Sequence, residues 1–162
     1  MRFFLIDRVT AWVPGERAES VKNVSLSEDY LRDHFPRVPT MPGVLMLEAM
    51  AQLSGIILED AVLTRQKRRT TAVLSIVEKA KFRRLVKPGD QLRIVAEGLE
   101  VREESGRSRT KAFVGPDLAA SAELMFTWFD LTDARLLAKR QEVVDVWMRD
   151  LREREAAARG PA

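Results

Sequence analysis

The feature that most constrains the fold is a long apolar segment from Gly43 to Leu58, which carries Glu48 and Gln52 within it. The segment ends at Glu59-Asp60 and is shorter than the roughly 20 residues that a bilayer span needs. We expect a helix from Gly43 to about Leu63 that is apolar on nearly every side. Such a helix has to be surrounded by protein, so the rest of the chain must cover it.

Segments that favour β-structure lie before and after this helix in the sequence, and turn residues separate them from one another. We expect strands over 9–13, 17–24, 70–82, 91–102, 108–114 and 119–129. A short helix is expected from Ser27, as its cap, to Leu31, and an irregular loop from Phe35 to Pro42, which holds three prolines. Several antiparallel strands with one apolar helix predict an α+β architecture in which the sheet wraps the helix.

The C-terminal segment differs in composition from the rest of the chain. Residues 133–159 are rich in Ala, Arg and Glu, and their apolar side chains lie near helical spacing at Leu136, Val143, Val146, Trp147 and Leu151. This pattern predicts an amphipathic helix that docks or oligomerises. We therefore divide the chain into a domain over 1–131 and a helical extension over 132–162.

Composition excludes several classes of function. A chain of 162 residues fits one domain with a sizeable core, and its net charge of +3 does not demand a nucleic-acid partner. Zero cysteines remove disulfides and thiolate metal sites from consideration and fit a reducing cytoplasm. The apolar run at the N-terminus, Phe3 to Ile6, is too short for a signal-peptide core. We expect a cytoplasmic protein without a membrane span.

The only histidine, His34, lies shortly before the start of the apolar helix at Pro42-Gly43. Histidine titrates near neutral pH, so His34 is a candidate general base. The amides of Gly43 and Val44 begin the helix and can polarise a carbonyl, as an oxyanion hole does. Such a helix start also carries the positive end of the helix dipole.

A carboxylate and an amide follow within the helix. Apolar neighbours favour the protonated form of Glu48, which suits a general acid, and Gln52 lies four residues further on the same face, where it can orient Glu48. Together with His34 and Gly43, this set fits elimination of a β-hydroxyl from an acyl thioester. Each residue alone is more often structural, and only their joint occurrence favours a site.

The same residues resemble a known family. The signature of hotdog-fold 3-hydroxyacyl-[acyl-carrier-protein] dehydratases is similar to His34-Phe35-Pro36, Pro39, Met41-Pro42-Gly43-Val44-Leu45 and Glu48-Ala49-Met50-Ala51-Gln52. Further similarity includes Asp7-Arg8-Val9, Lys79-Ala80-Lys81-Phe82-Arg83-Arg84 and Val86-Lys87-Pro88-Gly89-Asp90. The resemblance covers roughly residues 5–129 and leaves the C-terminal helix outside.

The resemblance implies a curved antiparallel sheet around the long helix, and a homo-oligomer built from dimers. It implies that His34 of one chain and Glu48 of another share a site, with Gly43, and Val44 beside it, binding the thioester carbonyl. Substrate-tunnel positions fall on Phe35, Met46 and Phe82. The implied substrate is a 3-hydroxyacyl chain on the phosphopantetheine of acyl carrier protein, which loses water to give a trans-2-enoyl thioester without a metal or other cofactor.

Two features of this chain leave alternatives open. Asp33 and Arg37 stand where the family usually has glycine, and we expect both to point to solvent and to change only substrate preference. The alternatives are that they narrow the entry to the site or change the backbone angles of the loop, and that Asp33 favours the charged form of His34 and makes it a poorer base. An acidic carrier protein is expected to meet the basic residues Lys81, Arg83, Arg84 and Lys87, which could equally form a solvated strand edge.

Three functions remain compatible with the sequence. The first is a hydro-lyase that dehydrates 3-hydroxyacyl-[acyl-carrier-protein] in fatty acid or related acyl-chain biosynthesis. The second is a non-catalytic acyl-binding hotdog subunit, favoured by Asp33 and Arg37 and by the additional helix. The third is a hotdog acyl thioesterase, in which a carboxylate activates water.

Overall fold

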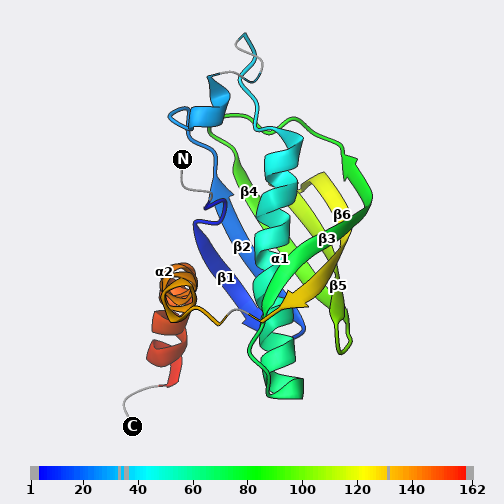
Figure 1. The fold of residues 1–162 in the computed structure, drawn as a ribbon. Helices are drawn as coiled ribbons and strands as arrows, with labels where there is room; N and C mark the ends of the chain where they lie inside the picture. The colour runs from blue at the N-terminus through cyan, green and yellow to red at the C-terminus, as the bar shows by residue number, and fades with distance from the viewer. Residues whose placement is uncertain (1–3, 33, 35–36, 131, 160–162) are drawn as a thin grey trace.

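The computed structural model describes residues 4–32, 34, 37–130 and 132–159 (Figure 1). A long helix, α1 (Gly43–Gln66), lies against a six-stranded sheet, and a second helix, α2 (Ala134–Arg159), follows the last strand. The strands are β1 (Arg8–Val13), β2 (Arg17–Asn23), β3 (Thr71–Phe82), β4 (Gln91–Val101), β5 (Ser105–Val114) and β6 (Asp117–Phe129). This arrangement confirms the α+β architecture that the sequence predicts.

The sheet has the strand order β1-β2-β4-β5-β6-β3, and every neighbouring pair is antiparallel. Strands β4, β5 and β6 follow one another through short turns, whereas β3 returns to pair with β6 at the edge of the sheet. Helix α1 contacts β2, β3, β4, β5 and β6, so the sheet wraps the helix (Figure 1). The two edges of the sheet are β1 and β3.

Helix α1 is buried on several sides, as an apolar helix requires. Its residues Met50, Leu53, Ile57 and Leu58 are fully covered and pack with side chains from the inner face of the sheet. The carbonyl of Pro42 accepts the first helical hydrogen bonds, and the helix continues three residues beyond Leu63, to Gln66. Lys67 then adopts a left-handed conformation (φ 55°) and ends the helix.

The short helix before the loop is a 3-10 helix, η1 (Asp29–Leu31). The prediction that Ser27 caps it is wrong, because the residue before the helix is Glu28 and makes no side-chain cap. The Ser27 hydroxyl instead lies 2.8 Å from the hydroxyl of Ser25. A side chain that bonds locally in the preceding turn does not reach the helix amides to cap them.

Helix α2 docks on its own chain. The Asp133 carboxylate caps it by accepting the amides of Arg135 (2.8 Å) and Leu136 (3.2 Å). Trp147 and Leu151 are buried where α2 meets the rest of the chain, and α2 contacts β1.

Of the helices in the described ranges, none is long and apolar enough to cross a membrane.

Gly106 in β5 permits a close approach of Trp128. A Cβ at Gly106 would lie 2.5 Å from Cη2 and 2.8 Å from Cζ2 of the indole, which is held by a 3.0 Å hydrogen bond from Nε1 to the carbonyl of Arg102. We expect Gly106→Ala to lower the free energy of unfolding by about 2 kcal/mol, because the added methyl overpacks this contact. Urea unfolding followed by tryptophan fluorescence measures the change, with Ser105→Ala as the neighbouring control. Equal stability of Gly106→Ala and the wild type would contradict the expectation.

Candidate active site

A cavity at the start of α1 brings together six of the residues that the sequence singles out, among them Arg83 and Arg84. It encloses about 370 Å³ and is lined by His34, Gly43, Met46 and Phe82, among others. The loop before α1 supplies His34, the helix supplies Gly43 and Met46, and the end of β3 supplies Phe82. We call this space the His34 cavity.

Gly43 lies directly under the ring of Phe82. A Cβ built at Gly43 would lie 3.1, 3.2 and 3.3 Å from three ring atoms of Phe82, so a larger residue would push the ring aside. Gly43 and Val44 are the first residues of α1, and amides at a helix start have no partners inside the helix. The Val44 side chain is 68% exposed, which leaves the helix start uncovered on that side.

Thr40 also lines the His34 cavity, although its sequence context does not mark it as a site residue. Its side chain is only 1% exposed, and its hydroxyl has no hydrogen-bond partner among the described residues. A buried hydroxyl of this kind is uncommon, and it can bond to a ligand that enters the cavity. No local pattern distinguishes a lone threonine in a proline-rich loop from an ordinary loop residue.

Glu48 and Gln52 form a hydrogen-bonded pair on α1. The Gln52 Nε2 donates to Glu48 Oε1 at 3.1 Å, and the Gln52 Oε1 accepts the backbone amide of Leu5 at 3.1 Å. Gln52 is therefore fixed by the N-terminal segment and in turn holds the carboxylate. The helical spacing that suggested this contact is the one the structure uses.

The Glu48 side chain does not share the His34 cavity. It lines a different cavity of about 330 Å³ together with Phe4, Gln52, Ile56 and residues of α2. Within one chain, the candidate base and the candidate acid therefore line separate spaces. We call the second space the Glu48 cavity.

The basic residues near the His34 cavity differ in their surroundings. Lys81, Arg83 and Lys87 are exposed. Arg84 is half-buried and forms ion pairs with Asp117 and, at 3.9 Å, with Asp90. The charge of Arg84 is therefore largely engaged within its own chain. Phe35 lies outside the described residues.

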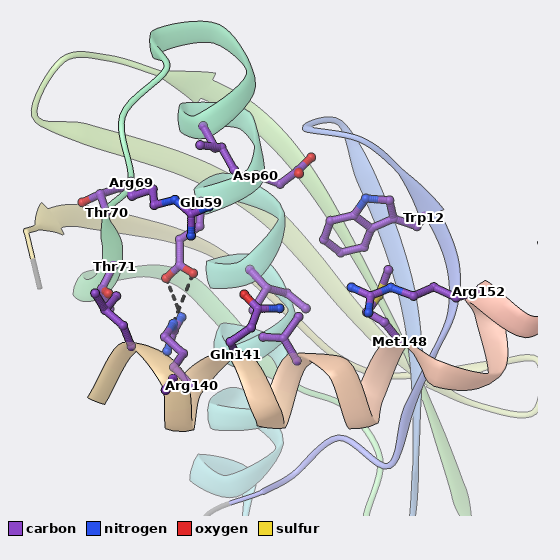
Figure 2. A pocket seen from close by; sticks show the side chains of 15 residues that line it. Trp12, Glu59, Asp60, Arg69, Thr70, Thr71, Arg140, Gln141, Met148 and Arg152 are labelled. Atoms are coloured by element: carbon purple, nitrogen blue, oxygen red, sulfur yellow. Dashed lines mark hydrogen bonds and ion pairs between the residues drawn. The ribbon is translucent and has the colours of Figure 1, made fainter. Parts of the chain in front are cut away.

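One carboxylate outside the set of sequence-predicted site residues is partly buried between the helices. Glu59 of α1 forms an ion pair with Arg140 of α2 (Figure 2). It also accepts the amide of Ala72 at 2.7 Å. Burial raises the pKa of the Glu59 carboxyl, and the nearby Arg140 guanidinium opposes that rise. This pair joins segments 81 positions apart in the sequence, so no local spacing points to it.

Comparison with known proteins places the chain in a family. A family model for a FabA-like domain matches residues 1–122. The 3-hydroxyacyl-[acyl-carrier-protein] dehydratase FabZ of Thioalkalivibrio sulfidiphilus is 44% identical over 126 residues, covering 76% of this chain and 85% of the relative. The FabZ of Pelotomaculum thermopropionicum is 46% identical over 125 residues, covering 76% and 86%.

Solved structures agree with this assignment at the level of fold. The dehydratase heterocomplex ApeI:P from Xenorhabdus doucetiae matches with a TM-score of 0.61 and 18% identity, covering 84% of this chain and 90% of that chain. This match confirms the hotdog fold that the sequence predicts. With the family model and the relatives in agreement, the chain belongs to the FabA-like family of 3-hydroxyacyl-[acyl-carrier-protein] dehydratases.

Proposed function

We propose that this protein removes water from 3-hydroxyacyl chains on acyl carrier protein and leaves trans-2-enoyl chains, as a hydro-lyase of fatty acid or related acyl-chain biosynthesis. The observation that carries the proposal is the His34 cavity, where an imidazole lies beside the open start of a helix. Relatives named for this reaction are 44% and 46% identical to the chain. Both facts favour an acyl thioester as the substrate.

The proposed mechanism assigns one step to each group. His34 takes a proton from the carbon next to the thioester carbonyl, and the amides of Gly43 and Val44 stabilise the negative charge that develops on the carbonyl oxygen. Glu48 gives a proton to the hydroxyl on the following carbon, and that hydroxyl leaves as water. The products are an enoyl thioester and water, and the balance requires no oxidant or reductant.

We propose that the site forms between two copies of the chain. Support comes from the separate cavities of His34 and Glu48 and from β3, an edge strand with exposed apolar side chains. These side chains are Val73, Ile76, Val77 and Phe82, each between 40% and 49% exposed. An apolar edge strand is a surface that a second copy can extend by pairing, which would bring His34 of one chain toward Glu48 of the other.

The proposal extends to the carrier protein and to the domains. Exposed Lys81, Arg83 and Lys87 are cations that an acidic carrier would meet close to the His34 cavity, which Arg83 also lines. Met46 and Phe82 line the same cavity and would contact the acyl chain or its thioester.

Residues 1–131 would form the hotdog domain, and 132–162 an extension of it.

A direct assay tests the function. Purified protein is incubated with 3-hydroxybutyryl-[acyl-carrier-protein], while the absorbance of the conjugated enoyl thioester and the release of free thiol are followed together. We expect enoyl product without thiol. Thiol release without enoyl product would point to a thioesterase, and tight binding without turnover would point to a non-catalytic subunit.

Gly43 offers a test of the helix start. We expect Gly43→Ala to lower kcat/KM roughly 10- to 100-fold, because the methyl group displaces Phe82 and shifts the substrate away from the amides. Steady-state kinetics measure the loss. Thr64→Ala, at the exposed far end of α1, serves as the control.

The double substitution Gly43→Ala with Phe82→Leu identifies the cause of that loss. A smaller side chain at 82 makes room for the methyl group, so part of the activity should return. If the single variant keeps wild-type kinetics, the close contact between Gly43 and Phe82 has no bearing on substrate positioning.

A further inference from the structure

Two cavities adjoin beneath α2. The Glu48 cavity encloses about 330 Å³, and a second cavity, which we call the Trp12 cavity, encloses about 510 Å³. Figure 2 shows the side chains that line the Trp12 cavity. Ile56 of α1 and Arg140 and Val144 of α2 line both of them. The two spaces therefore meet at these three shared residues.

Helix α2 forms a fixed wall over the Glu48 cavity. Its residues make up the side of the cavity opposite Glu48, Gln52 and Ile56, and they include Leu136, Val143, Val144 and Trp147. The indole of Trp147 is only 7% exposed and meets the ring of Phe4 edge to face, with the ring centroids 6.2 Å apart. The matched FabA-like domain ends at residue 122, before this wall begins.

The far end of α2 is anchored as well. The Arg154 guanidinium donates to the carbonyl of Thr10 at 3.2 Å, and Arg8 pairs with Asp150 at 3.3 Å. Leu151 is buried between these contacts, with 8% of its surface exposed. Packing at the Trp147 end and polar contacts at the Arg154 end hold the wall in one position.

The ion pair between Arg140 and Glu59 lies at the junction of the two cavities. Arg140 lines both cavities, whereas Glu59 lines only the Trp12 cavity. Figure 2 shows the guanidinium of Arg140 on α2 paired with the Glu59 carboxylate on α1. Both Nε and Nη2 of Arg140 donate to the carboxylate, the former at 3.3 Å. A two-point contact fixes the orientation of the planar guanidinium.

The space beyond the junction can accept an alkyl chain. Trp12, Leu63, Val144 and Met148 form an apolar side of the Trp12 cavity next to Ile56, whereas polar and charged residues line the rest of it. Burial of methylene groups against the apolar side is favourable. Eight residues of helix separate Glu48 from Ile56, a rise of about 12 Å. A chain whose reacting carbons lie at Glu48 and whose tail runs along α1 would therefore meet Arg140 at its end.

We propose that α2 is the outer wall of the acyl-binding cavity and that the Arg140–Glu59 pair closes its far end, which limits the length of the acyl chain that the enzyme accepts. The proposal rests on the proposed function, because it takes the reacting carbons of the acyl chain to lie at Glu48. It assigns to the C-terminal helix a direct contact with substrate. Shorter acyl chains would fill the Glu48 cavity alone, and longer acyl chains would require the Arg140–Glu59 pair to separate.

The test compares two double variants that differ only in the volume at position 140. Both carry Glu59→Gln, which removes the partly buried charge and keeps an oxygen for the amide of Ala72. Replacing both partners avoids the unpaired, partly buried carboxylate that Arg140→Ala alone would leave. Arg140→Ala then opens the junction, whereas Arg140→Met keeps it filled. Arg149→Ala, on an exposed position of α2 that lines neither cavity, is the control for loss of an arginine.

The measured quantity is the ratio of kcat/KM for 3-hydroxypalmitoyl to kcat/KM for 3-hydroxybutyryl carrier-protein substrates. We expect Glu59→Gln with Arg140→Ala to raise this ratio at least about tenfold, because several methylene groups gain a binding site. Glu59→Gln with Arg140→Met should keep the wild-type ratio. Val144→Phe, which narrows the junction, should lower it about tenfold.

A binding measurement separates this proposal from the proposed function. Calorimetry with 3-hydroxyacyl-pantetheine amides of the same two chain lengths gives the corresponding ratio of Kd values without any turnover. If the wild type fails to dehydrate either substrate, the proposed function is wrong, and the Kd ratios then decide whether the Arg140–Glu59 pair limits the length of the bound acyl chain. Identical ratios in the wild type, both double variants and Val144→Phe would overturn the proposal.

Discussion

Replacing His34 by alanine is expected to lower kcat for dehydration about a thousandfold. His34 is the only histidine in the chain, so no second imidazole can take over proton removal near neutral pH. The side chain is half-buried in the loop before α1, where its loss removes little packing. Initial rates of enoyl formation from 3-hydroxybutyryl-[acyl-carrier-protein] measure the effect.

The matched acid variant is Glu48→Gln, for which we expect a loss of similar size. Glutamine has nearly the shape of glutamate, and its carbonyl oxygen can still accept the hydrogen bond from Gln52. The variant therefore removes the transferable proton and keeps the contact. Melting temperatures of both variants should stay close to that of the wild type. A rate for His34→Ala within tenfold of the wild type would remove the imidazole from the mechanism.

The strands could be predicted from sequence because each one is a β-prone segment bounded by turn residues. The predicted ends of the strands are less accurate where pairing with a neighbouring strand determines the end. The strand expected from residue 108 begins at Ser105, because Ser105, Gly106 and Arg107 pair with residues of β6. A partner strand extends β5 beyond the point where the local sequence favours extended structure.

The candidate site divides in the same way. The pair of Glu48 and Gln52 follows from helical spacing, and the family resemblance links His34 with Gly43, Met46 and Phe82, which line one cavity. The wall that α2 builds over Glu48 could not be predicted. Apolar spacing shows which face of α2 is buried, but it does not show which surface that face covers.

The second large effect concerns the two-chain site. A heterodimer of one His34→Ala chain and one Glu48→Gln chain has one site with both native groups and one site with neither. We expect this heterodimer to recover about half of the wild-type activity, although each homodimer is nearly inactive. Two affinity tags on the co-expressed chains allow the heterodimer to be purified by sequential capture and assayed at once. A tagged wild-type heterodimer, prepared in the same way, sets the reference rate.

The reciprocal heterodimer separates a shared site from a site within one chain. It pairs a wild-type chain with a chain that carries both His34→Ala and Glu48→Gln. If each site takes His34 from one chain and Glu48 from the other, every site in this heterodimer lacks one group, and we expect a rate close to that of the single variants. A site built within one chain would instead leave the wild-type chain active and give about half of the reference rate. A shared site therefore makes the first heterodimer active and the reciprocal one nearly inactive, whereas a site within one chain gives the opposite result. The separate cavities of His34 and Glu48 favour the site shared between two chains.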